Sequence, residues 1–166
     1  TIADNFRINA SADTITNAFE NLTLRPFSYK LQMETALSKT PEYEEGFYTT
    51  DSYKAYSDAY AALEEFKASE PTFLNDDEGM SLIFALNQAY NALTLNEADT
   101  TPLEEAINTP LDYDVSFYTD ETYAEYQAAI DAGNEILAEE GLKIIDNDRI
   151  NAAADDNYAA IELLEF

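Results

Sequence analysis

The sequence predicts an all-α protein made of two tandem three-helix bundles, preceded by one extra N-terminal helix. Apolar residues recur at steps of three and four over long stretches, which is the spacing of one face of an α-helix. Only 4 glycines and 5 prolines occur in 166 residues, too few for a turn-rich all-β design. An internal repeat is the third observation, and it divides the chain.

Shifting the chain on itself by 70 residues reveals this repeat. The segment FYTT at residues 47–50 then lies over FYTD at residues 117–120. Residues 34–70 and 104–140 are identical at 13 of 37 positions in this register. Such agreement over half a repeat predicts two copies of one structural unit.

The N-terminal residues match the end of a repeat. RINASAD at residues 7–13 nearly duplicates RINAAAD at residues 149–155, and Leu22-Thr23-Leu24 duplicates Leu93-Thr94-Leu95. The chain begins at Thr1 without a signal-type apolar run, so we expect it to be a piece of a longer protein. The expected divisions are the terminal helix of a preceding truncated repeat at residues 1–25, a first three-helix repeat at residues 26–96 and a second at residues 97–166.

The first helix of the first repeat is expected at about residues 28–38. In the second repeat the helix should begin at Thr101, which is the predicted N-cap. Pro102 would then occupy the first helical position, and Glu104 is placed to complete a capping box.

The second helices are predicted near residues 50–68 and 120–139, where tyrosines and leucines follow helical spacing. Thr49 and Thr119 precede them as N-cap hydroxyls, and the acids that follow face the positive end of the helix dipole.

The tyrosines of the second helices are expected to be core residues. Ile130 stands where the first repeat has Tyr60, and an aliphatic side chain can replace a ring in a core but not in a ring-specific binding platform. The side chains predicted to be buried are Tyr53, Tyr56, Tyr123 and Tyr126.

The third helices are expected at residues 5–22, about 78–93 and 147–164. Two of them follow acidic clusters, Asp76-Asp77-Glu78 and Asp146-Asn147-Asp148, which suggest a calcium loop as one alternative. The ligand positions of such a loop, counted from Asp146, do not carry the required residues. Capping of the third helices is the interpretation we favour.

Tyr48-Thr49 with Ser52, and Tyr118-Thr119 with Thr122, each lead into an alanine-containing helix. This arrangement resembles the FIVAR module, a three-helix repeat of bacterial surface proteins, over nearly all residues from 27 onward. The residue that follows Ser52 and Thr122 is a tyrosine in both copies, whereas a tryptophan or another large apolar residue would be typical of the family at that position. The resemblance implies an extracellular module, attached to an adhesin, a cell-wall protein or a polysaccharide-degrading enzyme, and implies no catalytic residues.

Composition excludes several functions. The chain has 34 acids, 8 bases and no histidine or cysteine, so an imidazole base, a thiolate nucleophile and the usual zinc or haem ligands are all lacking. A net charge of −26 opposes binding to nucleic acids or anionic membranes. No pair of aspartate or glutamate residues stands out in the sequence as the catalytic pair of a hydrolase. We expect no enzyme activity, no cofactor and no metal.

Aromatic residues outside the helical stripes leave carbohydrate binding open. They are Tyr29, Tyr43, Tyr113 and Phe73. The interpretation we favour for Tyr43 and Tyr113 is that they close the loop between the first two helices over the core. The expected function is a non-catalytic spacer or interaction module on a bacterial surface or in a secreted protein, whose partners are the other modules of the same parent protein. The alternatives are a carbohydrate-binding accessory module that binds polysaccharide and a helical bundle that binds a host surface protein.

Overall fold

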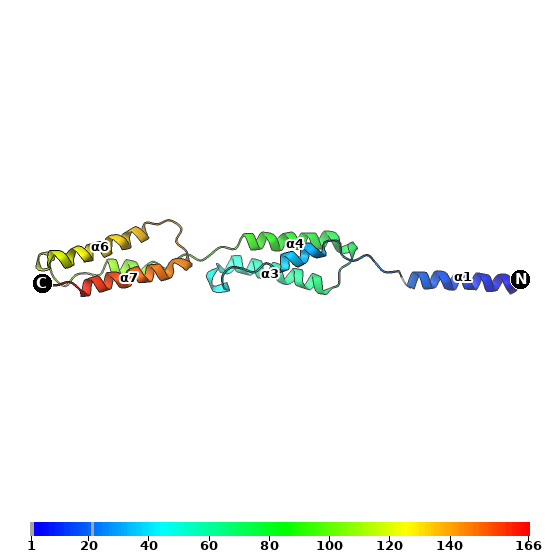
Figure 1. The fold of residues 1–166 in the computed structure, drawn as a ribbon. Coiled ribbons are helices and arrows are strands. Elements are labelled where there is room, and N and C mark those ends of the chain that lie inside the picture. The colour runs from blue at the N-terminus through cyan, green and yellow to red at the C-terminus, as the bar shows by residue number, and fades with distance from the viewer. Residues whose placement is uncertain (1, 21) are drawn as a thin grey trace. The chain divides into compact units, whose positions relative to one another are not determined.

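The regular structure is helical, as predicted. The computed structural model describes residues 2–20 and 22–166, with the side chains of residues 7–19 and 22–166. Within these residues, β-structure is limited to three isolated bridges (Figure 1). The α-helices of the described residues are α1 (Ile2–Glu20), α2 (Lys30–Leu37), α3 (Thr50–Ala68), α4 (Asp76–Asn91), α5 (Thr101–Ile107), α6 (Asp120–Leu137) and α7 (Asn147–Glu162).

The element order of the first repeat recurs in the second. In both, a short helix is followed by a 3-10 turn, a long helix, a second 3-10 turn and a third helix. The 3-10 turns are η1 (Glu45–Phe47), η2 (Phe73–Asn75), η3 (Val115–Phe117) and η4 (Ile144–Asp146). Equivalent positions differ by 70 residues in the first two helices, as for the buried pair Met33 and Leu103, and by 71 in the third helices.

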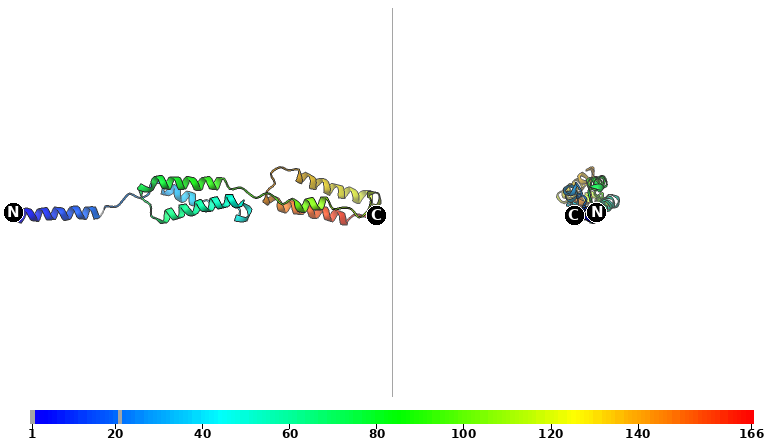
Figure 2. Two further views of the ribbon diagram at one scale, coloured as in Figure 1. Left: turned by 180° about the vertical axis from the view of Figure 1, so that it is seen from behind. Right: turned by 90° about the vertical axis from the view of Figure 1, so that its right-hand side faces the viewer.

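The chain forms two compact units. Unit 1 comprises Thr1–Pro41 and Lys54–Ala92, and unit 2 comprises Glu42–Tyr53 and Leu93–Phe166. The loop that follows α2 therefore packs with the residues after α4. In unit 2, α5, α6 and α7 lie side by side and pack on one another (Figures 1 and 2).

Helix positions agree with the prediction for the second and third helices, which end within about two residues of the expected positions. The predicted N-cap at Thr101 is wrong by one residue, because the Thr101 N–H donates to Asp99 Oδ1 at 3.0 Å and Thr100 is the N-cap. Thr119 caps α6 as predicted, accepting from the Thr122 N–H at 3.4 Å.

Burial of the four tyrosines is confirmed for Tyr56 alone. Its ring is buried, and its hydroxyl donates to the Lys39 carbonyl at 3.1 Å. Tyr53, Tyr123 and Tyr126 are only half-buried. A tyrosine at the edge of a core can bury its ring while its hydroxyl stays near water, so helical spacing alone overestimates its burial.

The two repeats fill one core position with exchanged volumes. In unit 1, Phe27 packs against Gly79 of α4, and its ring meets Phe66 edge-on at a centroid distance of 5.3 Å. The equivalent residues of unit 2 are Ala98 and Ile150. A large and a small side chain have changed places, which keeps the volume of the core similar.

A second exchange lets two helices approach closely. Leu63 and Leu86 are fully buried in unit 1, and their equivalents in unit 2 are Gly133 and Asn157. The Asn157 side chain is buried and donates to the carbonyls of Ala129 at 3.1 Å and Ala153 at 2.8 Å. Its amide thus rests on the α6 backbone where glycine leaves room, and α6 and α7 approach more closely than α3 and α4.

Replacing Gly79 by alanine should destabilise unit 1, although alanine favours helix. A methyl group there would overlap the Phe27 ring and stand 2.8 Å from the Phe66 ring. We expect a loss of about 1–3 kcal/mol in the free energy of unfolding, measured by denaturant titration, as for other overpacked cores.

Two further variants test the cause. Gly46→Ala is the control, because nothing lies within 4 Å of the added methyl group. In a Phe27→Ala background the overlap with the Phe27 ring disappears and only the 2.8 Å approach to Phe66 remains. Gly79→Ala should therefore destabilise less there than in the unaltered chain, because the helix propensity of alanine, worth roughly 1 kcal/mol, offsets the remaining contact. Equal effects of Gly79→Ala in both backgrounds would contradict this explanation.

Candidate functional site

The residues after α4 return to the loop that precedes α3. The Thr49 N–H donates to the Thr94 carbonyl at 2.8 Å, and the Thr94 N–H donates to Ser52 Oγ at 3.2 Å. The Thr49 hydroxyl donates to Ser52 Oγ at 2.9 Å and so positions it. We call Thr49 and Ser52, with their equivalents Thr119 and Thr122, the hydroxyl clamps.

The second hydroxyl clamp repeats this geometry after α7. The Thr119 N–H donates to the Glu165 carbonyl at 2.8 Å, and the Glu165 N–H donates to Thr122 Oγ1 at 3.2 Å. Glu165 is the equivalent of Thr94, so the side chain held in the clamp differs while the backbone contact is kept. The clamp therefore recognises an extended backbone, since both of its bonds go to main-chain atoms.

Asn96 fixes the connecting segment, residues 93–99, through three of its groups. Its N–H donates to the Phe47 carbonyl at 2.9 Å, and its side-chain amide donates to the carbonyls of Gly46 and Tyr48, each at 3.0 Å. Its own carbonyl accepts from the Ile144 N–H at 2.9 Å. All of these residues belong to unit 2.

The second half of the connecting segment binds the turn before α7. The Ala98 N–H donates to the Leu142 carbonyl at 3.2 Å, the Asp99 N–H donates to Asn147 Oδ1 at 2.9 Å, and Glu97 forms an ion pair with Lys143.

Unit 1 contains the same scheme at its own turn, before α4. The Phe27 N–H donates to the Pro71 carbonyl at 3.3 Å, and the Ser28 N–H donates to Asp76 Oδ1 at 2.9 Å. The guanidinium of Arg25 lies over the Phe73 ring, 4.8 Å from its centroid.

The acidic clusters differ from the expected helix caps. The N-cap residues of α4 and α7 are Asn75 and Asp146, and neither side chain accepts a bond from a backbone N–H of its α-helix. Asp146 Oδ2 accepts from the Lys143 N–H at 2.9 Å, which caps the 3-10 turn before α7. Asn147 holds the connecting segment, and Asp76 holds Ser28 in the corresponding segment of unit 1. The clusters therefore organise the turn where that segment docks.

The four aromatic residues considered for carbohydrate binding are divided between the two units, two in each. Tyr29 contacts Phe27, and Phe73 lies under Arg25, both in unit 1. Tyr43 stacks on Phe47 at a centroid distance of 5.5 Å. Tyr113 meets Phe166 edge-on at 5.0 Å.

Tyr113 and Phe166, the ring that it contacts, are both exposed, as is Phe117. Tyr113, Phe117 and Phe166 are 56%, 62% and 73% exposed, whereas Tyr43 and Phe47, the equivalents of the first two, are half-buried. In the first copy, Asn96 hydrogen-bonds the carbonyls of residues 46–48 beside these rings. We call Tyr113 and Phe166, whose rings meet edge-on, the exposed aromatic cluster.

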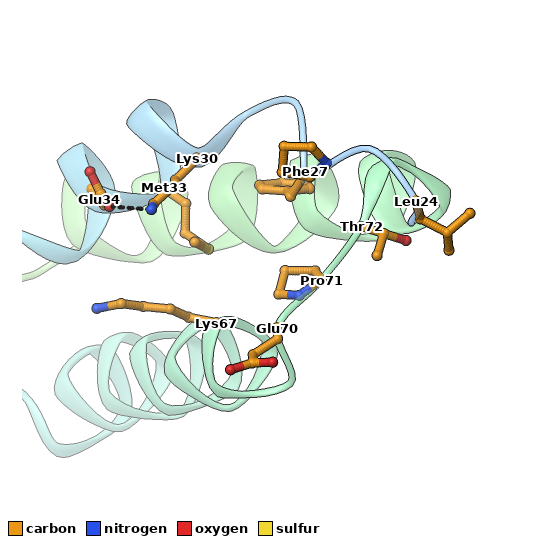
Figure 3. Close-up of a pocket in the computed structure, with 10 residues that line it drawn as sticks. Leu24, Phe27, Lys30, Met33, Glu34, Lys67, Glu70, Pro71 and Thr72 are labelled. Carbon is orange, nitrogen blue, oxygen red and sulfur yellow. Dashed lines mark ion pairs between the residues drawn. The ribbon is translucent and has the colours of Figure 1, made fainter. Parts of the chain in front are cut away.

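A hollow of about 510 Å³ lies in unit 1 beside the start of α2 (Figure 3). Phe27, Met33 and Pro71 supply apolar surface. Its charged residues are exposed and in part ion-paired, as in Lys30 with Glu34 at 3.9 Å and Lys67 with Glu64 at 3.5 Å. A ligand site usually adds convergent polar groups that fix orientation. Here the charged side chains pair along the helix surfaces instead, as in a gap between packed helices.

Glu70, which lines this hollow, has a φ of 54°. That left-handed conformation is unfavourable for a residue with a Cβ. In the second repeat Gly141, one position beyond the equivalent of Glu70, has a φ of 76°, so the chain reverses in this conformation after the second helix of both repeats. Helix termination accounts for the strain.

Within the described residues, no group of three or more histidine, cysteine, aspartate or glutamate side chains is arranged to hold a metal ion. None of the helices described is long and apolar enough to cross a membrane. Comparisons of the chain with known protein families, with curated proteins and with solved structures gave no match.

The sequence contained a signal for the connecting segment. Leu22-Thr23-Leu24 and Leu93-Thr94-Leu95 repeat at a distance of 71 residues outside any helix, where sequence is usually variable. The residues that bind this segment could not be predicted from the sequence, because Ser52 and Thr122 are equally typical of a helix N-terminus.

Removing a clamp hydroxyl should weaken unit 2. Thr122→Val keeps the size of the side chain but removes the acceptor for the Glu165 N–H. We expect the free energy of unfolding to fall by about 0.5–1.5 kcal/mol, the usual net value of one hydrogen bond. Thr122→Ser keeps the hydroxyl and is the matched control. Equal stability of the Val and Ser variants in denaturant titrations would show that the hydroxyl contributes nothing.

Proposed function

We propose that this chain is a non-catalytic spacer built from tandem three-helix repeats of FIVAR type, within a secreted or surface-exposed bacterial protein. The extracellular location rests on the resemblance of the Tyr-Thr motifs described above. The spacer function rests chiefly on one observation, which is how the connecting segment is bound.

The connecting segment has little freedom to act as a flexible tether. Its residues 94, 96, 98 and 99 all donate backbone N–H bonds to defined partners. Asn96 alone joins the carbonyls of residues 46–48 to the turn before α7. A flexible linker exposes its backbone to water, so the consumption of these donors indicates an ordered junction.

The same bonding scheme occurs at residues 25–28, with the turn before α4 as partner. A scheme that recurs with different side chains is set by the backbone and by a few polar groups. Such a junction can be reused along an array, because each repeat then contacts only its neighbours. The net charge of −26 adds repulsion that keeps such an array soluble.

Amide hydrogen exchange tests the ordered junction. We expect the amides of Thr49, Asn96 and Ile144 to exchange on the order of 100-fold more slowly than in an unstructured chain, because each donates to a backbone carbonyl. Asn96→Ala should speed exchange at these amides. Asn134→Ala, an exposed position in α6, is the control and should leave them unchanged. Exchange at the unstructured rate in the unaltered chain would contradict the spacer proposal.

A second candidate is carbohydrate binding by the exposed aromatic cluster, since sugars commonly stack on exposed rings. Pull-down on insoluble polysaccharide and a glycan array test it. If it is correct, Tyr113→Ala should abolish retention, whereas Phe84→Ala, which removes a ring of similar exposure from α4, should not. If the unaltered chain is not retained on any glycan, this candidate is wrong.

A further inference from the structure

Helix α1 carries an apolar face whose equivalents are covered elsewhere in the chain. Ile8, Ile15 and Phe19 are 64%, 57% and 69% exposed. The position of Ile8 corresponds to Gly79 in α4 and Ile150 in α7, and that of Ile15 corresponds to Leu86 in α4; all three are buried. Isolated exposed apolar residues are common, but Ile8 and Ile15 stand at the positions of buried residues and share one helical face with Phe19, which indicates a face that a partner covers.

The structure shows what covers such a face. In unit 2, α7 packs on both α5 and α6, the first two helices of its repeat. Ile150 and Ala154 of α7 form one core with Leu103 and Ala106 of α5. Ile8 and Ala12 occupy the same two positions in α1.

Charge adds a second requirement. Arg149 of α7 binds Glu139 through two bonds of 2.7 Å each and lies 3.5 Å from Asp146. The bond to Arg149 lowers the pKa of Glu139. Arg7 occupies the position of Arg149 in α1, and it is exposed. A partner for α1 should therefore present a carboxylate at the end of its second helix.

The residues after α1 add a third requirement. Leu22-Thr23-Leu24 has the same sequence as Leu93-Thr94-Leu95, in which the Thr94 backbone is bound by a hydroxyl clamp. Thr23 stands at the position of Thr94. The partner of α1 should thus carry a hydroxyl clamp before its second helix.

We infer that α1 docks a helical hairpin of this same repeat type, formed by the equivalents of α5 and α6 with a hydroxyl clamp and a carboxylate at the Glu139 position. The inference rests on the tandem-repeat proposal and names the partner. The hairpins of the described residues already pack on α4 and α7, so a second copy of this chain offers no vacant hairpin. The partner is therefore a hairpin of two helices that lacks a third helix of its own, and α1 completes its three-helix bundle.

A chimera tests this inference on the intact chain. Residues 97–146 are placed directly before residue 5, because residues 5 and 147 are equivalent at the 142-residue shift that aligns residues 7–13 with 149–155. We expect the added hairpin to fold on α1, so that the amides of α1 exchange at least about 100-fold more slowly than in the unaltered chain. The amides of α4 and α7 serve as internal controls for folding.

The control chimera carries Ile8→Asp and Ile15→Asp. Both positions are exposed in the unaltered chain, so these changes should not disturb units 1 and 2 outside α1. Slow exchange of α1 in the first chimera and fast exchange in the control would support the inference. Equal exchange of α1 in both chimeras, with α4 and α7 protected, would overturn it.

Analytical ultracentrifugation of the unaltered chain tests whether a second copy of the chain is the partner of α1. A monomer at all concentrations agrees with the inference, whereas a dimer that Ile15→Asp dissociates would overturn it, because the occupant would then be a second copy. Exchange at the junction amides of Asn96 and Ile144 is measured independently of α1. Failure of this inference can therefore be separated from failure of the spacer proposal.

Discussion

The need to satisfy the backbone of the connecting segment is the constraint on which the rest of the structure depends. An extended segment between helices leaves donors and acceptors that helices satisfy internally. This chain satisfies them with the Ser52 hydroxyl, the backbone of Phe47 and Thr49, and the turn before the third helix, including the Asn147 side chain. The positions of Thr49, Ser52 and Asn96 follow from that need, as does the inclusion of residues 42–53 in unit 2.

The cores are less constrained than the connections. Phe27 with Gly79 and Ala98 with Ile150 fill the same place with opposite sizes, and Leu63 with Leu86 gives way to Gly133 with Asn157. The first exchange keeps the total volume and the second is accommodated by a closer approach of two helices, so a core tolerates either, whereas a hydrogen bond to the backbone requires a particular donor or acceptor in a particular place. The docking geometry therefore repeats more faithfully than the core that it connects.

Sequence reasoning predicted the helices well because their signals are local. The spacing of Tyr53, Tyr56 and Leu63 located α3 to the residue, and the repeat register placed α6. Burial of Tyr126 and the role of Asp76 were not predictable in this way, since both depend on residues far away in the chain. Asn157 has the same origin: a buried amide makes sense only once Gly133 lies opposite it. The resemblance to FIVAR modules remains a prediction.

The central claim, that hydrogen bonds order the connecting segment, can be measured most directly as scalar couplings across those bonds by NMR. The account predicts couplings from the amide nitrogen of Thr49 to the carbonyl carbon of Thr94, and from that of Ile144 to that of Asn96, since both bonds are shorter than 3 Å. Their absence, in spectra that show the couplings within α6 and α7, would contradict the account.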